Sequence, residues 1–236
     1  VIPNGGIKMV VADGAGSGAA VTDVLDMTGG TGNVGLGSGN LGTALTTGTD
    51  NVAIGEASLD AVTTGSDNTA VGDNAAGALT TGGNNVAIGS GALLVATTGD
   101  NNTAVGSSAL IATTTGGSNT GVGQDALKAN TTGATNVAVG RDALEDNTTA
   151  DGNVAVGYGA ARNNTTGASN VAIGYLALDV NTTGASNVAV GFQALDANTT
   201  ASNNVAVGYD ALTANTTGTG NSALGKGSLG ANTTAS

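Results

Sequence analysis

Residues 187–203, NVAVGFQALDANTTASN, contain the pattern that decides the fold of this chain. The run Val188-Ala189-Val190 alternates larger and smaller apolar residues, which is the period-two pattern of a β-strand. Gly191 follows as a bend, and the residues Phe192 to Leu195 are expected to form a second short strand. The segment DANTTASN is rich in the Asn, Asp and Ser residues that favour turns.

The same 17-residue unit recurs without insertion from residue 51 to the end of the 236-residue chain. Each unit has a closing Gly and an Asn four residues before it. A less regular copy, GNVGLGSGN around Gly37, precedes the series and is displaced by one residue. Fixed self-similarity of this kind is typical of repeat proteins, in which each unit packs on its neighbours. The Asn positions are Asn51, Asn68, Asn85, Asn102, Asn119, Asn136, Asn153, Asn170, Asn187, Asn204 and Asn221.

The length and composition of the unit predict an all-β fold. A unit this short cannot hold two packed helices, and its Gly, Asn, Thr and β-branched residues disfavour helix. We predict that residues 33–236 form a parallel β-solenoid of about twelve coils, stacked about 4.8 Å apart. Residues 1–32 are expected to form a capping or joining segment, with a hairpin turn at Asn4-Gly5-Gly6.

Stacking of the units predicts which positions fill the core. The position before each closing Gly, as in Ile54 and Val71, is always β-branched or Leu and is expected to point into the coil. The Leu59 position, four residues after the Gly, is expected to fill the same core. Ala53 and its equivalents are expected to face a neighbouring chain, because small side chains allow close approach of another backbone. The Asn positions predict an amide ladder, in which each side chain bonds the one above and the one below.

The composition argues against several classes of function. The chain has no Cys and no His, so thiolate zinc sites, cysteine nucleophiles and the commonest general base are missing. A net charge of −12 disfavours binding to nucleic acid and to anionic membranes. No apolar run approaches the length of a membrane span, so membrane insertion is not expected. We therefore predict a protein that is not an enzyme and that needs no cofactor.

Two short patterns resemble ligand sites. The acidic residues near turns, Asp50, Asp67, Asp100 and Asp151, lack the spacing of calcium-binding solenoids and are interpreted as solvated turn residues. The stretch GGTGNVGLG, residues 29–37, has the glycines of a phosphate-binding loop but no helical segment after it. Neither pattern predicts a metal or phosphate site.

The motif N-[VT]-A-[VI]-G-x-x-A-L, followed in many units by NTTG, resembles the repeat region of bacteriophage tail-fibre proteins. It is also similar to the head repeats of trimeric autotransporter adhesins. The resemblance covers residues 51–236, with a weaker copy from Asn33. It implies a left-handed β-roll assembled as a homotrimer, the structural shaft of a tail fibre or comparable fibre, located on a virion or outside the cell. The thin core of each coil independently favours an oligomer.

An adhesin or receptor-binding fibre that recognises cell-surface glycan is the alternative. The residue after the closing Gly is aromatic in four consecutive units, and these are all the Tyr and Phe residues of the chain. At coil spacing the rings predict a stacked ladder. This ladder either stiffens the rod or presents apolar faces with polar tips to sugar rings as a receptor contact. Its members are Tyr158, Tyr175, Phe192 and Tyr209.

Seven units contain Asn-Thr-Thr, a formal N-glycosylation acceptor that is interpreted as incidental in a bacterial or viral fibre. Earlier units have Val62, Leu79, Ala96 and Thr113 in the Asn position, which predicts a change of surface or of chain packing near residue 120. The paired Thr residues also raise a remote alternative, an ice-binding solenoid. Adjacent strand residues point to opposite faces, so only one outward Thr rank is expected. The acceptor positions are Asn130, Asn147, Asn164, Asn181, Asn198, Asn215 and Asn232.

Overall fold

The computed structural model describes residues 10–12, 21–23, 32–42 and 44–235, and its elements are all β-strands. Two of them, β1 (Val10–Ala12) and β2 (Val21–Asp23), pair antiparallel, with Val11 opposite Thr22. The turn expected at Asn4 lies outside the described residues. The other strands form one parallel sheet in chain order, and all have three residues. They are β3 (Val34–Leu36), β4 (Val52–Ile54), β5 (Thr69–Val71), β6 (Val86–Ile88), β7 (Thr103–Val105), β8 (Thr120–Val122), β9 (Val137–Val139), β10 (Val154–Val156), β11 (Val171–Ile173), β12 (Val188–Val190), β13 (Val205–Val207) and β14 (Ser222–Leu224).

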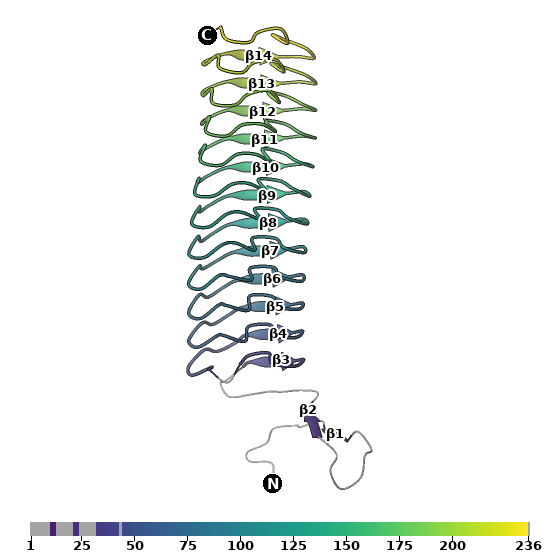
Figure 1. The fold of residues 1–236 in the computed structure, drawn as a ribbon, viewed down its shortest axis with the longest axis vertical. Helices are drawn as coiled ribbons and strands as arrows, with labels where there is room; N and C mark the ends of the chain where they lie inside the picture. The colour runs from purple at the N-terminus through teal and green to yellow at the C-terminus, as the bar shows by residue number, and fades with distance from the viewer. Residues whose placement is uncertain (1–9, 13–20, 24–31, 43, 236) are drawn as a thin grey trace.

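The strands stack one above another into a rod, with one strand in each coil (Figure 1). Each strand pairs in register with the next, so that Val188 lies beside Val205 and Ala189 beside Ala206. Val34 of β3 lies beside Val52 of β4, which makes the first coil one residue longer than the others. The predicted parallel β-solenoid with 17-residue coils is therefore confirmed.

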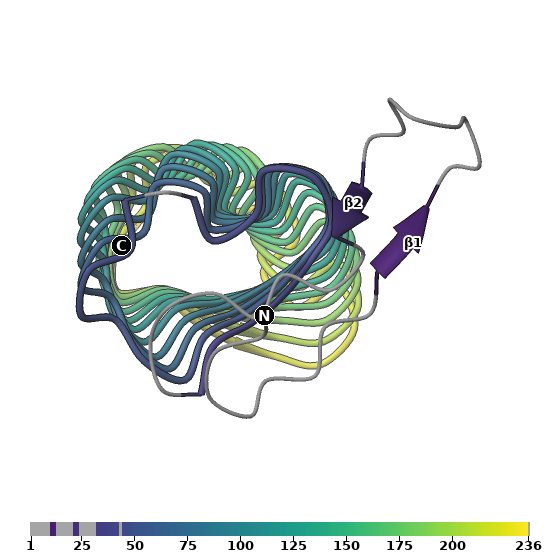
Figure 2. The ribbon, with the colours of Figure 1, turned by 90° about the horizontal axis from the view of Figure 1, so that it is seen from below.

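Hydrogen bonds between coils continue around the whole outline and are not confined to the short strands. The amide of Leu59 donates to the carbonyl of Ala75 at 3.1 Å, and that of Thr63 donates to Thr80 at 2.9 Å. Viewed along the rod, successive coils follow nearly the same path (Figure 2). Pairing of this kind satisfies backbone polar groups even in segments that have no regular secondary structure.

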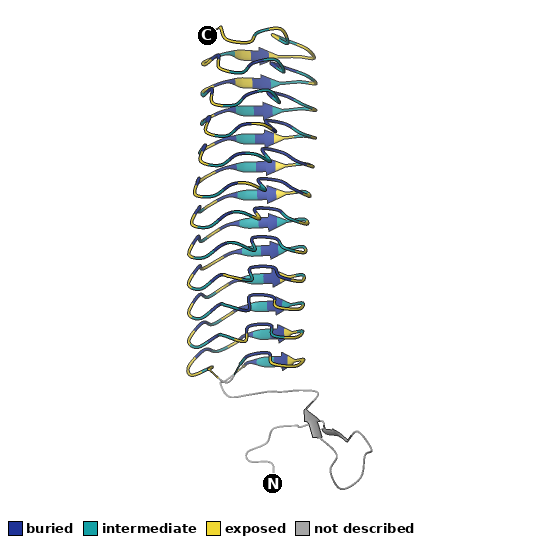
Figure 3. Ribbon diagram, in the orientation of Figure 1, coloured by how far each residue is buried: buried dark blue, intermediate teal, exposed yellow. Residues whose placement is uncertain are grey.

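In strands β3–β14 the middle residue is buried, and the residues on either side of it are half-buried or exposed (Figure 3). Ala53, Ala189 and their equivalents are buried, whereas Ile88 is 39% exposed. Two predictions are therefore wrong: the β-branched position does not fill the core, and the Ala position does not face outward. The reason is that the interior of the coil is too narrow for a large side chain at the middle position of the strand. A Cβ built on Gly121, in the Ala position, would lie 3.3 Å from Cγ of Leu110, so the interior accepts nothing larger than Ala.

The Leu59 position fills the core as predicted. Leu59, Leu110 and Leu195 are fully buried. The second strand expected at residues 192–195 is wrong, because these residues form a turn. Gln193 and Leu195 have φ angles of 49° and 54°, in the left-handed region. Two such residues close together bend the chain sharply around the corner, which is incompatible with an extended strand.

The closing Gly of each unit is required by close approach of the next coil. Gly72 has a φ of 136°, a conformation that is almost exclusive to glycine. A Cβ at this position would lie 2.7 Å from the carbonyl carbon of Gly89 in the following coil. The bend after each strand can therefore stack at strand spacing only if every coil has Gly there.

Candidate functional site

The expected amide ladder is present inside the rod. The backbone amide and the side-chain amide Nδ2 of Asn68 both donate to Oδ1 of Asn51, at 3.1 and 3.0 Å. Nδ2 of Asn68 also donates to the carbonyl oxygen of Gly82 at 3.0 Å. A backbone amide bonded to the Oδ1 of the preceding ladder residue recurs up to Asn221. These amides hold coils together, and from Asn51 to Asn204 their burial leaves them unable to contact a ligand.

A second amide ladder runs beside the first in the C-terminal half of the rod. Nδ2 of Asn147 donates to Oδ1 of Asn130 at 2.9 Å and to the carbonyl oxygen of Ala150 at 3.1 Å. Asn130, Asn147 and the equivalents up to Asn215 are fully buried, so glycosylation of the folded chain could not reach them. The sequence did not predict this ladder, because the Asn-Thr-Thr pattern was interpreted as an incidental glycosylation acceptor.

The change expected near residue 120 lies in the interior of the rod. Val62, Leu79, Ala96 and Thr113 occupy the second-ladder position in earlier coils, and all four are buried. The N-terminal coils therefore have apolar side chains, followed by Thr113, where the later coils have amides. The expectation of a change of surface at this position is wrong. One feature of the sequence indicates the buried position. Three residues after the core Leu, the early coils have Val or Leu where the later coils have Asn.

The four aromatic residues form a continuous stack on the outside of the rod. The ring centroids are 5.4 Å apart for Tyr158 and Tyr175, 5.3 Å for Tyr175 and Phe192, and 4.9 Å for Phe192 and Tyr209. The planes of successive rings differ by 17°, 7° and 6°. We call this group the aromatic ladder. Its members are between 38% and 47% exposed.

Cations cover the two ends of the aromatic ladder. The guanidinium carbon of Arg141 lies 6.0 Å from the ring centroid of Tyr158, and Nζ of Lys226 lies 5.2 Å from that of Tyr209. Each ring face is thus opposite another ring or a cation. The ladder offers ring edges and Tyr hydroxyl groups to a partner, whereas a sugar that stacks on aromatic side chains needs an open ring face.

The outward residues of the strands form an apolar surface along the whole rod. We call the first and third residues of β3–β14 the outer strand face. No charged residue occurs at these positions in any of the twelve strands of this sheet, although the chain has a net charge of −12. Ile88, Ile173 and Val205 on this face are 39–40% exposed. A large exposed apolar surface on a protein is typical of an interaction site.

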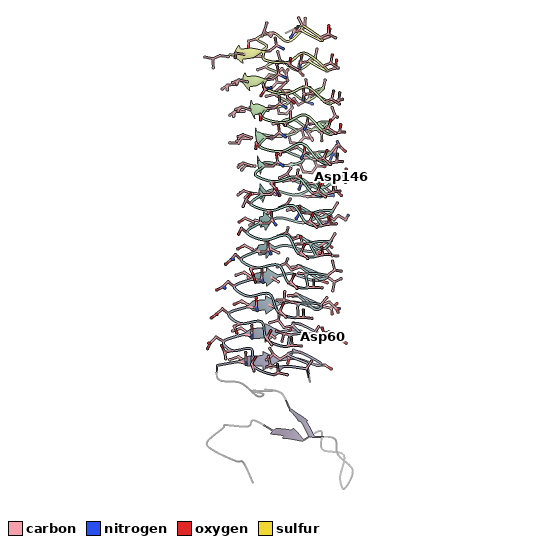
Figure 4. All side chains as sticks on the ribbon, turned by 90° about the vertical axis from the view of Figure 1, so that its left-hand side faces the viewer. Asp60 and Asp146 are labelled. Carbon is pink, nitrogen blue, oxygen red and sulfur yellow. The ribbon has the colours of Figure 1, made fainter. Side chains whose placement is uncertain are left out.

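Charged side chains lie on another flank of the rod. Figure 4 shows Asp60 and Asp146 on the side away from the strands. On this flank Nη2 of Arg162 lies 3.1 Å from Oδ2 of Asp179, which is largely buried. Burial raises the pKa of the Asp179 carboxyl, and although Arg162 acts in the opposite direction, the pKa stays above its ordinary value. Part of the charge of the chain therefore lies on a flank away from the outer strand face.

The carboxylates of two turn residues, Asp100 and Asp151, accept hydrogen bonds from backbone amides of the preceding coil. Oδ1 of Asp100 accepts a hydrogen bond from the amide of Gly83 at 2.7 Å, and Oδ1 of Asp151 accepts one from Ala134 at 2.7 Å. In the described part of the chain, no three acidic residues are grouped so that they could hold a metal ion. The same part contains no helix with the length and hydropathy of a membrane span.

The Thr pairs form a single outward rank. The hydroxyl of the first Thr bonds to the next coil, as when Thr63 donates to the carbonyl oxygen of Thr80 at 3.0 Å. The second Thr of the pair, as in Thr64, is exposed. The exposed Thr side chains therefore form an array that is only one residue wide.

Comparisons with models of protein families, with curated proteins and with solved structures found no match for this chain. Its function is therefore inferred from the surfaces of the rod. Two of them have exposed side chains that the fold of a single chain does not require: the outer strand face and the aromatic ladder.

Proposed function

We propose that this chain is the structural shaft of an extracellular fibre, in which three copies associate side by side through the outer strand face. The observation that carries the proposal is this continuous, uncharged surface, β-branched at every position from β4 to β13, on an otherwise acidic rod. The resemblance of the repeat to tail-fibre sequences favours the virion as the location of the fibre. The proposal includes no catalysis, no cofactor and no binding of nucleic acid.

The physical argument rests on burial. Removing apolar surface from water contributes about 25 cal/mol per Å², and the outer strand face repeats this contribution in every coil. Because the face contains no charge, a second copy can cover it without desolvating a carboxylate. Three copies around a common axis form a closed assembly, in which each copy has two neighbours. The inter-coil hydrogen bonds give each copy the stiffness that a shaft requires.

A pair of matched double variants tests the assembly. Ile88→Lys with Ile173→Lys places two charges on the outer strand face, whereas Thr98→Lys with Thr183→Lys places two charges on exposed residues of the same coils. The native mass of the wild type and of the Thr variant is expected to be three times 22.0 kDa. The Ile variant is expected to be monomeric with unchanged circular dichroism. A monomeric wild type, or a trimeric Ile variant, would contradict the proposal.

Receptor binding by the aromatic ladder is the second candidate. The observation that favours it is the row of exposed Tyr residues at coil spacing, with centroids 5.4 Å apart for Tyr158 and Tyr175. Their hydroxyl groups could donate hydrogen bonds to a cell-surface glycan. Replacement of Tyr158, Tyr175 and Tyr209 with Ser separates this function from scaffolding. Lost attachment to host cells at an unchanged melting temperature would support a receptor surface, and a lower melting temperature with full attachment would contradict it.

A further inference from the structure

Two tyrosines of the aromatic ladder face each other in consecutive coils of one chain. The ring centroids of Tyr158 and Tyr175 are 5.4 Å apart, and the ring planes differ by 17°. The two residues are 38% and 47% exposed, so both rings can be reached from the solvent. The next ring in the stack is that of Phe192, which separates Tyr175 from Tyr209. Tyr158 and Tyr175 are therefore the one pair of stacked tyrosines in the described part of the rod.

The backbone holds these two tyrosines at a fixed spacing. The strands that precede them, β10 and β11, pair in register, and after the bend the amide of Leu176 donates to the carbonyl oxygen of Tyr158 at 3.0 Å. The two bends have the same shape, since φ is 132° at Gly157 and 136° at Gly174. Both side chains thus start from equivalent positions in adjacent coils. A reaction between the two rings needs no encounter between separate chains, which is a large advantage in rate.

The composition of the chain directs one-electron oxidation to tyrosine. The chain has no Cys, Trp or His, and its two Met residues, Met9 and Met27, precede the rod. Loss of one electron and of the hydroxyl proton turns a Tyr side chain into a phenoxyl radical. The unpaired electron of this radical is shared between the oxygen and the ring carbons ortho to it, which can form bonds. Phe192 has no hydroxyl proton to lose, so the reactive pair ends at Tyr175.

We propose that Tyr158 and Tyr175 are a site of oxidative cross-linking, where a peroxidase that consumes hydrogen peroxide joins the two rings within one chain. Each phenol gives one electron to the oxidant and one proton to water. The two radicals form a carbon–carbon bond between ortho positions, and the proton on each bonded carbon moves to the phenol oxygen. One hydrogen peroxide takes up the two electrons and two protons and becomes two water molecules. The resulting dityrosine ties the coil of β10 covalently to the coil of β11.

Trypsin digestion locates the cross-link. Because Arg162 lies between the two tyrosines, complete digestion places Tyr158 in peptide 142–162 and Tyr175, with Tyr209, in peptide 163–226. After treatment with peroxidase and hydrogen peroxide, the wild type is expected to show dityrosine fluorescence in a denatured chain of monomer size that has lost two hydrogen atoms. Its digest should contain these two peptides joined together. Dityrosine found only in covalent dimers of the chain would overturn the proposal.

Matched variants that keep the ring stack assign the cross-link to this pair. Tyr175→Phe removes one phenol of the pair, so the yield of dityrosine in the monomer is expected to fall at least several-fold. Tyr209→Phe removes a phenol two coils from Tyr175, about 9.6 Å away, and is expected to leave the yield unchanged. Phe192→Tyr places four phenols in a row and is expected to raise the yield, because a second pair can form. An unchanged yield in Tyr175→Phe, or a loss in Tyr209→Phe, would contradict the assignment.

Unfolded wild type separates the effect of the stacked geometry from that of closeness in sequence. The two tyrosines are 17 residues apart in the chain, and a loop of this length also closes in an unfolded chain. At the same concentration of oxidant, the chain unfolded in urea is expected to give a several-fold lower yield of dityrosine in the monomer. A small phenol added to both samples verifies that the peroxidase is equally active in urea. Equal yields from folded and unfolded chains would overturn the proposal.

Discussion

Arg162 and Asp179 occupy the same position in consecutive coils, and their side chains meet with Nη2 and Oδ2 at 3.1 Å. Burial raises the pKa of the Asp179 carboxyl, Arg162 lowers it, and Asp196 in the next coil raises it further. The pKa in the folded chain is therefore above 3.8, the ordinary value for this group. The folded state binds the proton more tightly than the unfolded state, so this group contributes stability that rises as pH falls through the folded pKa.

Asp179→Asn is expected to remove this contribution to the pH dependence. The free energy of unfolding of the wild type, relative to the variant, should increase as pH falls from 7 toward 4. Arg162→Gln should make the increase larger, because the partner that lowers the Asp179 pKa is lost. Urea unfolding of the three proteins at both pH values measures the difference. Parallel pH profiles for wild type and Asp179→Asn would contradict the assignment.

Asn136→Ala should be among the most destabilising single changes to a polar residue. Asn136 bonds to Asn119, donates to the carbonyl oxygen of Ala150 at 2.8 Å and accepts from the amide of Asn153 at 2.9 Å. Its removal leaves buried groups unpaired, at a cost of about 1–3 kcal/mol for each group. Thr132→Ala in the preceding coil changes an exposed side chain and is expected to cost less than about 0.5 kcal/mol. Equal losses in urea unfolding would count against the ladder.

Ala189→Leu should destabilise each chain from within. Ala189 is fully buried inside the coil, and added methylene groups have no free space there. Overpacking of this kind costs typically about 1–3 kcal/mol. Because the strain lies inside a single chain, the fall in the thermal midpoint should be the same at low and high protein concentration. A fall that appears only in the oligomer would instead place Ala189 at a contact between chains.

Thr135→Asn is expected to stabilise the rod. Thr135 has a φ of 58°, and the equivalent residues in the other 17-residue coils are Asp, Asn, Ser or Gly. A β-branched residue in the left-handed region is strained, and Asn tolerates this region better by about 1 kcal/mol. The reciprocal change, Asn101→Thr at a φ of 60°, should destabilise by a similar amount. Changes of the same sign in the two melting temperatures would refute the explanation by backbone conformation.

The period of the repeat was sufficient to predict the solenoid, the stacking of equivalent positions and the core position of Leu59. It was not sufficient to decide which strand face lies inside, because an alternating pattern reads the same in both orientations. Side-chain size suggested that Ile54 was internal and Ala53 external, and only the narrow coil interior reverses this choice. The corner at Leu195 was also missed, since Leu rarely adopts the left-handed conformation and its side chain suggested a strand. Of the two candidate surfaces, the aromatic ladder could be predicted and the outer strand face could not.

Pairing between coils joins residues 17 positions apart almost everywhere in the rod, as Val188 and Val205 do. Deletion or duplication of one whole unit would therefore restore each interior contact with an equivalent residue, whereas loss of one residue would move Gly and Leu out of their stacks. Recombination within the coding sequence can consequently change the length of such a protein in steps of one coil without creating a new fold. Length becomes a trait that evolution can adjust in whole units while every remaining interface between coils stays the same.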